Sequence, residues 1–142
     1  MAAIANDWLS HGTVECTDMA ATRAFLEDFL GLDVHRPFRE AQYMYKGGPW
    51  TVVCVCVEGG ETKDQPTDNR FKLVVDDAAE VRRAHGAAIA RQGDYGVRAV
   101  SELTDGDDPS FMVQDLDHNW WEITARGQSY YDALFEKGDI AA

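Results

Sequence analysis

One histidine, one arginine and one glutamate could together perform acid–base chemistry in this chain of 142 residues. His11 begins a strand-like segment, and Glu122 follows Trp120 and Trp121 in another. Burying a carboxylate among aromatic side chains is costly unless a partner compensates its charge. We therefore expect Glu122 to share a bound group or ion with His11. Arg70, whose guanidinium is permanently charged, could hold an organic anion beside them.

The alternation of side chains along a strand indicates which residues accompany these three. In the strand-like segment 70–75, Arg70 and Lys72 share one face and the apolar Phe71 and Leu73 share the other. The apolar face should pack on a helix, so the two cations should point to the opposite side. The same rule gives further candidates for substrate binding, which are Thr13 and Glu15 beside His11, and Trp120 beside Glu122.

These side chains predict proton transfer on a small organic anion. Arg70 would grip a carboxylate or enolate oxygen, because the guanidinium fork matches such groups and stabilises developing negative charge. His11 could move a proton, because an imidazole is the side chain suited to proton transfer near neutral pH, while Glu122 could orient His11 or act as the base itself. Isomerase or lyase chemistry next to a carbonyl fits these roles. In an alternative interpretation, Arg70 is only the internal counter-ion of Glu122 or Glu15.

The elements that must position these residues follow the order strand, helix, three strands, twice over. A helix is expected from Met19 to Leu30, capped by Asp18, and a second one from Asp76 or Asp77 to Arg91. The sequence predicts an α+β fold of one domain, 1–142, with a first βαβββ module at 8–59, a second at 69–125 and a tail at 126–142. Strands are expected at 11–17, 34–39, 42–46 and 51–58, and then at 70–75, 97–104, 110–114 and 120–124.

A short helix is expected in the tail, from Gln128 to Lys137, with several apolar side chains on one side. A terminal helix face of this kind needs a cover. We expect it to pack on the chain's own sheet, with a partner subunit as the alternative.

Composition limits the partners. The net charge of −12 disfavours nucleic acid and anionic lipid. No apolar run approaches the roughly 20 residues of a membrane helix, and the first residues have neither a basic start nor a long apolar core. Cys16, Cys54 and Cys56 cannot all pair with one another, and their apolar surroundings predict buried thiols in a reducing compartment. We expect a cytoplasmic protein with a small-molecule substrate and no membrane partner.

Three segments together resemble the vicinal oxygen chelate superfamily, which contains glyoxalases, extradiol dioxygenases and bleomycin resistance proteins. They are 11–18 (HGTVECTD) with 25–32 (FLEDFLGL), 71–77 (FKLVVDD) and 111–123. The resemblance implies two βαβββ modules whose mixed sheets form a cup with the helices outside. It also implies a divalent metal in many members, and a homodimer.

The resemblance places metal ligands at some positions of this chain and not at others. His11 matches the first-strand histidine of the family and Glu122 the last-strand glutamate, whereas Arg70 occupies the position of the second module's histidine. A catalytic metal generally needs three protein ligands, and arginine offers only donors. A metal held by His11 and Glu122 would therefore need a third ligand that is not known, for which the candidates are Asn69, Cys54, Cys56 and Glu58. The other alternative is a cup without metal.

The leading hypothesis is a small enzyme of isomerase or lyase type. Its substrate would be an organic acid or a carbonyl or phenolate compound, and it would lack the usual three-ligand metal. The first alternative is a metal-free protein that sequesters a small molecule and so confers resistance. The second is a metal-dependent, ring-cleaving dioxygenase. Arg70 argues against this second alternative, because it occupies the position of a metal-binding histidine.

Overall fold

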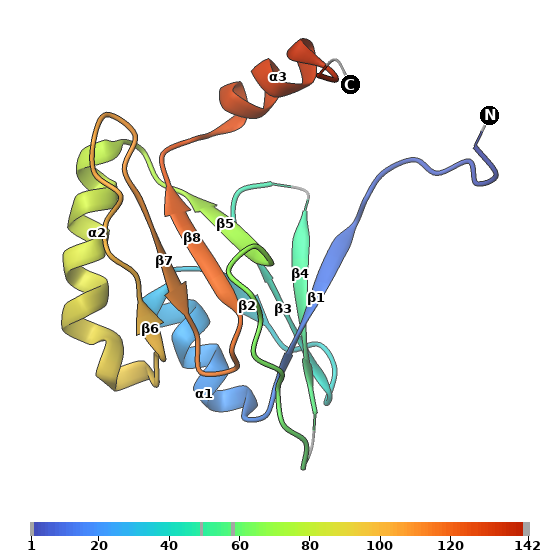
Figure 1. Ribbon diagram of the computed structural model, residues 1–142. Helices are drawn as coiled ribbons and strands as arrows, with labels where there is room; N and C mark the ends of the chain where they lie inside the picture. Colours follow the sequence, from blue (N-terminus) through green and yellow to red (C-terminus); the bar gives the residue numbers. More distant parts are fainter. Residues whose placement is uncertain (1, 49, 58, 141–142) are drawn as a thin grey trace. The chain divides into compact units, whose positions relative to one another are not determined.

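The computed structural model describes residues 2–48, 50–57 and 59–140 (Figure 1). It divides into two compact units, Met1–Lys63 and Asp64–Ala142, and the division falls in the polar loop between the two predicted modules. Each unit contains a four-stranded mixed sheet, with three α-helices in the described chain. That the chain forms one domain stays a prediction.

The first unit follows the predicted order of strand, helix and three strands. Its sheet, called sheet A here, has the order β1-β4-β3-β2, in which β1 and β4 are parallel and the other neighbours antiparallel. The Asp18 carboxylate caps the first helix by accepting hydrogen bonds from the backbone N–H groups of Ala20 and Ala21. The elements are β1 (His11–Cys16), α1 (Met19–Ala24), η1 (Phe25–Phe29), β2 (Asp33–His35), β3 (Ala41–Tyr45) and β4 (Thr51–Cys56).

The helix-facing side of sheet A carries the core of this unit. Val14 and Cys16 of β1 are buried, and Cys16 Sγ lies 3.5 Å from Met19 Sδ of α1. Gln42 of β3 donates to the Met19 carbonyl at 3.3 Å. None of the three cysteines forms a disulfide among the described residues. Cys16 and Cys54 are buried as expected, whereas Cys56 is only half-buried. The opposite face of β1 is left for His11, Thr13 and Glu15, all exposed.

The second unit repeats the arrangement and adds the C-terminal helix. Its sheet, called sheet B, has the order β5-β8-β7-β6, with β5 and β8 parallel. Phe111, Val113, Trp121 and Ile123 are buried on one face, and Val81 is buried on the second helix. The elements are β5 (Arg70–Val74), α2 (Ala78–Arg91), η2 (Gln92–Tyr95), β6 (Ala99–Val100), β7 (Ser110–Gln114), β8 (Trp120–Thr124) and α3 (Gln128–Lys137).

Two predicted strands are shorter than expected, for local reasons. The strand predicted at 34–39 ends at His35, because Pro37 has no N–H for a ladder. The strand predicted at 97–104 is reduced to β6 and a single bridge between Thr104 and Ser110. There the Ser101 hydroxyl accepts the N–H of Met112 at 2.8 Å in place of a backbone carbonyl.

The helix boundaries also differ in detail. The predicted helix 19–30 is α-helical to Ala24 and continues as the π-helical turn η1. Asp77, and not Asp76, caps α2 by accepting the N–H of Glu80 at 2.8 Å. Strand β4 ends at Cys56, and Glu58 lies outside the described residues. No helix in the described part of the chain has the length and apolarity to cross a bilayer.

The C-terminal helix has the predicted bounds but not the expected packing. In α3, Leu134 and Phe135 are 46% and 86% exposed, so the expectation that its apolar side packs on the chain's own sheet is wrong for these two. Tyr130 and Tyr131 alone are half-buried among its ten residues. Their contacts are electrostatic, as described below.

Candidate functional site

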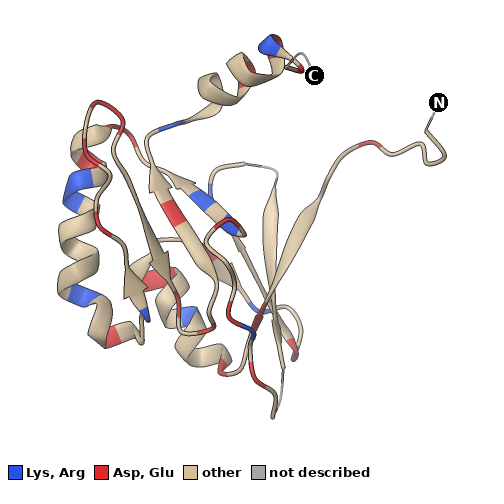
Figure 2. Cartoon of the chain, viewed as in Figure 1, with Lys and Arg blue, Asp and Glu red and all other residues tan. Residues whose placement is uncertain are grey.

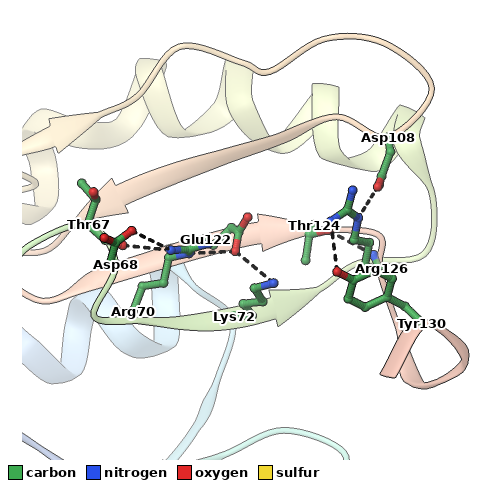
Figure 3. A network of polar contacts seen from close by, with 9 residues as sticks. All are labelled: Thr67, Asp68, Arg70, Lys72, Asp108, Glu122, Thr124, Arg126 and Tyr130. Carbon is green, nitrogen blue, oxygen red and sulfur yellow. Dashed lines mark hydrogen bonds and ion pairs between the residues drawn. The ribbon is translucent and has the colours of Figure 1, made fainter. Parts of the chain in front are cut away.

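Arg70, Lys72 and Glu122 meet on one face of sheet B (Figure 3). The parallel register places Lys72 opposite Glu122, and Arg70 opposite Trp120, so all four side chains share a face. Arg70 Nε donates to Glu122 Oε2 at 3.0 Å, and Lys72 Nζ lies 3.5 Å from the same oxygen. The three residues are called the charged cluster below. Figure 2 shows it as basic residues on β5 next to an acidic one on β8.

The cluster carries one more positive than negative charge and is only partly covered. The side chains of Arg70 and Lys72 are each 29% exposed, and that of Glu122 is 14% exposed. Arg70 Nη1 also donates to the Thr67 carbonyl at 3.2 Å, and it lies 3.9 Å from the fully exposed Asp68 carboxylate. No described residue donates a hydrogen bond to the second oxygen of Glu122, Oε1. That oxygen is therefore available to accept a proton.

Neutral side chains flank the cluster on the same face. Trp120 is half-buried, and its indole N–H donates to the Gln65 carbonyl at 2.7 Å. Met112 of β7 is the register partner of Glu122. Gln114 donates to Asp64 Oδ1 at 2.6 Å. The Gln65 carbonyl thereby helps to hold the orientation of Trp120. That Trp120 contacts a substrate stays a prediction.

The turn before β8 is organised by a buried carboxylate. Asp115 Oδ1 accepts the N–H groups of Asp117 and Asn119 at 2.8 and 2.9 Å, and Oδ2 accepts the Trp121 indole N–H at 2.9 Å. Burial raises the pKa of Asp115 to about 6, although these hydrogen bonds oppose the rise. His118 closes the turn in a left-handed conformation, with φ of 69°. The turn sets the point at which β8 begins, and it thereby sets the position of Glu122 along the strand.

The remaining predicted site residues belong to the first unit. His11, Thr13 and Glu15 share the exposed face of β1, as alternation predicts. The Nδ1 atom of His11 lies 3.2 Å from the hydroxyl of Ser10. The structure thus brings together Arg70 and Glu122 with their neighbours on sheet B. That His11 acts with them stays a prediction.

The donor set around Glu122 does not fit a divalent cation. A metal at the Oε2 oxygen would lie beside two cations that already contact this atom, and an arginine cannot give up its charge. Within the described ranges, no group of three or more His, Cys, Asp or Glu side chains could hold a metal ion.

The proposed third ligands do not improve the fit. The Asn69 amide donates to Gln65 Oε1 at 2.7 Å. Cys54 is fully buried, and Cys56 Sγ lies 3.9 Å from the Thr17 carbonyl. Glu58 lies outside the residues that the structure describes.

Sequence reasoning missed the contact between the charged cluster and α3. The ammonium of Lys72 lies 6.0 and 5.9 Å from the ring centroids of Tyr130 and Tyr131. Arg126 lies over the Tyr130 ring at 4.8 Å and pairs with Asp108 (Figure 3). The crowding of aromatic residues in the tail was the available signal, but spacing along the sequence does not identify their partner.

Known proteins resemble this chain in structure, whereas comparison of the sequences alone finds no significant match. No family model matches it, and no curated protein matches it significantly in sequence. Fosfomycin resistance protein FosX from Mesorhizobium loti is 18% identical, with a TM-score of 0.66 over 89% of this chain and 98% of its own.

Two further solved structures point to the same fold. A mutant of FosX from Listeria monocytogenes, complexed with Mn(II) and 1S,2S-dihydroxypropylphosphonic acid, is 18% identical, with a TM-score of 0.67 over 92% of this chain and 99% of its own. Lactoylglutathione lyase from Agrobacterium tumefaciens is 16% identical, with a TM-score of 0.61 over 84% of this chain and 93% of its own. As its sequence motifs predict, the chain has the fold of the vicinal oxygen chelate superfamily.

Proposed function

We propose that this chain is a small enzyme of isomerase or lyase type that removes a proton from an organic anion without a divalent metal. Its substrate would bear a carboxylate, carbonyl or phenolate oxygen. One observation carries the proposal: Arg70 and Lys72 both contact Oε2 of Glu122, while Oε1 receives no donor from any described residue. A carboxylate oriented through one oxygen in this way is suited to act as a base through the other.

The proposed reaction uses the excess positive charge of the cluster. An incoming anion would be drawn to Arg70 and Lys72, which would bind it with their other N–H groups and keep their contacts with Glu122 Oε2. Glu122 Oε1 would then accept a proton from the carbon next to the carbonyl, and the electron pair left on that carbon would form an enolate. The guanidinium and ammonium would stabilise the enolate oxygen. Return of the proton to another position gives isomerisation, whereas expulsion of a leaving group gives a lyase.

The proposal also assigns roles to the other predicted site residues and a working form to the protein. We propose His11 as a second proton-transferring group, because an imidazole titrates near neutral pH. Thr13, Glu15 and Trp120 are proposed to contact the substrate. A homodimer in the cytoplasm is proposed as the working form.

A second candidate is a binding protein that sequesters a small anion. The specific observation in its favour is the 3.0 Å contact between Arg70 Nε and Glu122 Oε2. This contact is the one expected if Arg70 is only the internal counter-ion of Glu122. A cluster that already balances its carboxylate could hold an anion with its surplus charge and perform no chemistry. A ring-cleaving dioxygenase needs iron, which the donor set around Glu122 does not favour.

Deuterium exchange separates the two candidates. In D2O, the wild type is expected to speed exchange of the protons next to the carbonyl of pyruvate or phenylpyruvate by at least about 100-fold, a normal yield of general base catalysis. The measurement is the loss of the proton NMR signal. Glu122→Gln should return the rate to that of buffer, because the amide cannot accept the proton.

Glu102→Gln serves as the matched control, since Glu102 is an exposed carboxylate outside the cluster. It should exchange as fast as the wild type. Binding of these acids that depends on Arg70 but brings no exchange would favour sequestration. If Glu122→Gln exchanged these protons as fast as the wild type, Glu122 could not be the base.

A further inference from the structure

The half-buried tyrosines of α3 lie next to the charged cluster. Lys72 Nζ is 5.9 Å from the Tyr131 ring centroid and 6.0 Å from that of Tyr130, within the range of a cation–π contact. The other eight residues of α3 are exposed. The helix therefore meets the described chain mainly through two rings placed next to a lysine of the cluster.

Tyr130 anchors this arrangement. The guanidinium of Arg126 lies over its ring at 4.8 Å and donates to its hydroxyl at 3.4 Å, while Arg126 also pairs with Asp108. Tyr131 packs edge to face with Tyr130, with ring centroids 5.3 Å apart and planes at 81°. The position of Tyr131 is thus set by its neighbour.

Distances indicate what Tyr131 would touch. A carboxylate bound to the Lys72 ammonium would lie at about 2.8 Å, the usual length of a charge-assisted hydrogen bond. Because the Tyr131 centroid is 5.9 Å from the same nitrogen, a carboxylate that binds Lys72 to one side of the line between them would place its attached group beside the ring. The neutral side chains beside the cluster on the sheet, Trp120 and Met112, are also partners of aromatic rings.

We infer that the substrate is an organic acid that carries an aryl or similarly planar unsaturated group beside its proton-bearing carbon, as phenylpyruvate does, and that Tyr131 determines this specificity. The inference rests on the anion-binding function proposed above and names its substrate class. A planar ring would stack against Tyr131 and gain the added attraction of an aromatic pair. A saturated ring of equal size would gain only apolar contact.

Two acids of equal charge and similar size test this inference by calorimetry. Benzoate should bind the wild type about threefold to tenfold more tightly than cyclohexanecarboxylate, the usual value of one aromatic contact beyond its buried area. Tyr131→Leu should remove that preference, since it keeps an apolar side chain but no ring. Tyr131→Phe should retain it. The phenylalanine variant keeps the ring packing on Tyr130, so it also controls for a folding defect.

The outcomes separate this inference from the proposed function. Equal affinity for both acids, with both weakened by Arg70→Met, would overturn the aryl specificity and leave the anion site standing. A preference for benzoate that persists in Tyr131→Leu would overturn the role of Tyr131. Failure of both acids to bind the wild type, or binding that is unchanged in Arg70→Met, would overturn both proposals.

Discussion

At the scale of single residues, Arg70 decides which chemistry is open to the charged cluster. The Nε atom of Arg70 lies 3.0 Å from Glu122 Oε2, so the carboxylate of the cluster already forms an ion pair with a permanent cation. A neutral imidazole at this position would instead offer a lone pair and leave the carboxylate to a metal. The residue at this position therefore decides whether the side chains of the cluster suit an anion or a metal ion.

Arg70→His should therefore raise the affinity for Mn(II). The variant exchanges a charge that repels the dication for a ligand that can hold it, and an increase of at least about tenfold over the wild type is expected for one added ligand. Titration followed by the electron paramagnetic resonance signal of free Mn(II) measures it. Arg70→Lys is the matched control, because it keeps the charge and adds no ligand. Stoichiometric manganese, iron, nickel or zinc in the wild type purified without chelator would contradict the argument.

At the scale of elements, the turn before β8 should give a pH dependence that follows from Asp115. Burial raises the pKa of this carboxyl from 3.8 to about 6 in the folded state, a difference of about 3 kcal/mol. A folded pKa above the unfolded one means that the folded state binds more protons in this interval. Its contribution to stability is fully present below about pH 4 and is lost as the pH rises through about 6.

Comparison with Asp115→Asn isolates this contribution from the other acids. The free energy of unfolding of the wild type minus that of the variant should fall by up to about 3 kcal/mol from pH 4 to pH 7. Urea denaturation at each pH measures both. The exposed Asp107→Asn serves as control and should show a nearly flat difference. A difference that increases with pH for Asp115→Asn would mean that its hydrogen bonds outweigh burial.

Local pattern predicted most elements and, within each strand, which side chains share a face. Alternation correctly grouped Arg70 with Lys72, and Trp120 with Glu122, because a strand's period is a property of the backbone. The structure adds the pairing of β5 with β8, which puts both groups on one face. The shortened β2 and β6 depend on single groups, the missing N–H of Pro37 and the hydroxyl of Ser101, which interrupt an otherwise regular pattern. The contact of Tyr131 with Lys72 joins positions far apart in the sequence, and no periodicity reports such a pair.

At the scale of the whole molecule, the charge of the chain opposes the charge of its proposed substrate. The chain carries −12, whereas the cluster has a surplus of one positive charge. Repulsion by the distributed acids acts over the Debye length, about 30 Å at 0.01 M salt and about 8 Å at 0.15 M. Attraction by Arg70 and Lys72 acts at contact distance, where salt screens it less. The net charge should therefore hinder approach more than it weakens the bound state.

Moderate salt should consequently strengthen the binding of benzoate. Between 10 and 150 mM sodium chloride the association rate is expected to rise about twofold, because the long-range repulsion is screened first. Stopped-flow measurement of the change in tryptophan fluorescence would follow the rate, since Trp120 lies beside the cluster. Benzyl alcohol, a neutral ligand of similar shape, should show no such rise. An association rate that falls steadily over the same range would mean that the local charge of Arg70 and Lys72 already dominates the field that the substrate meets, and that the acidic composition serves another purpose.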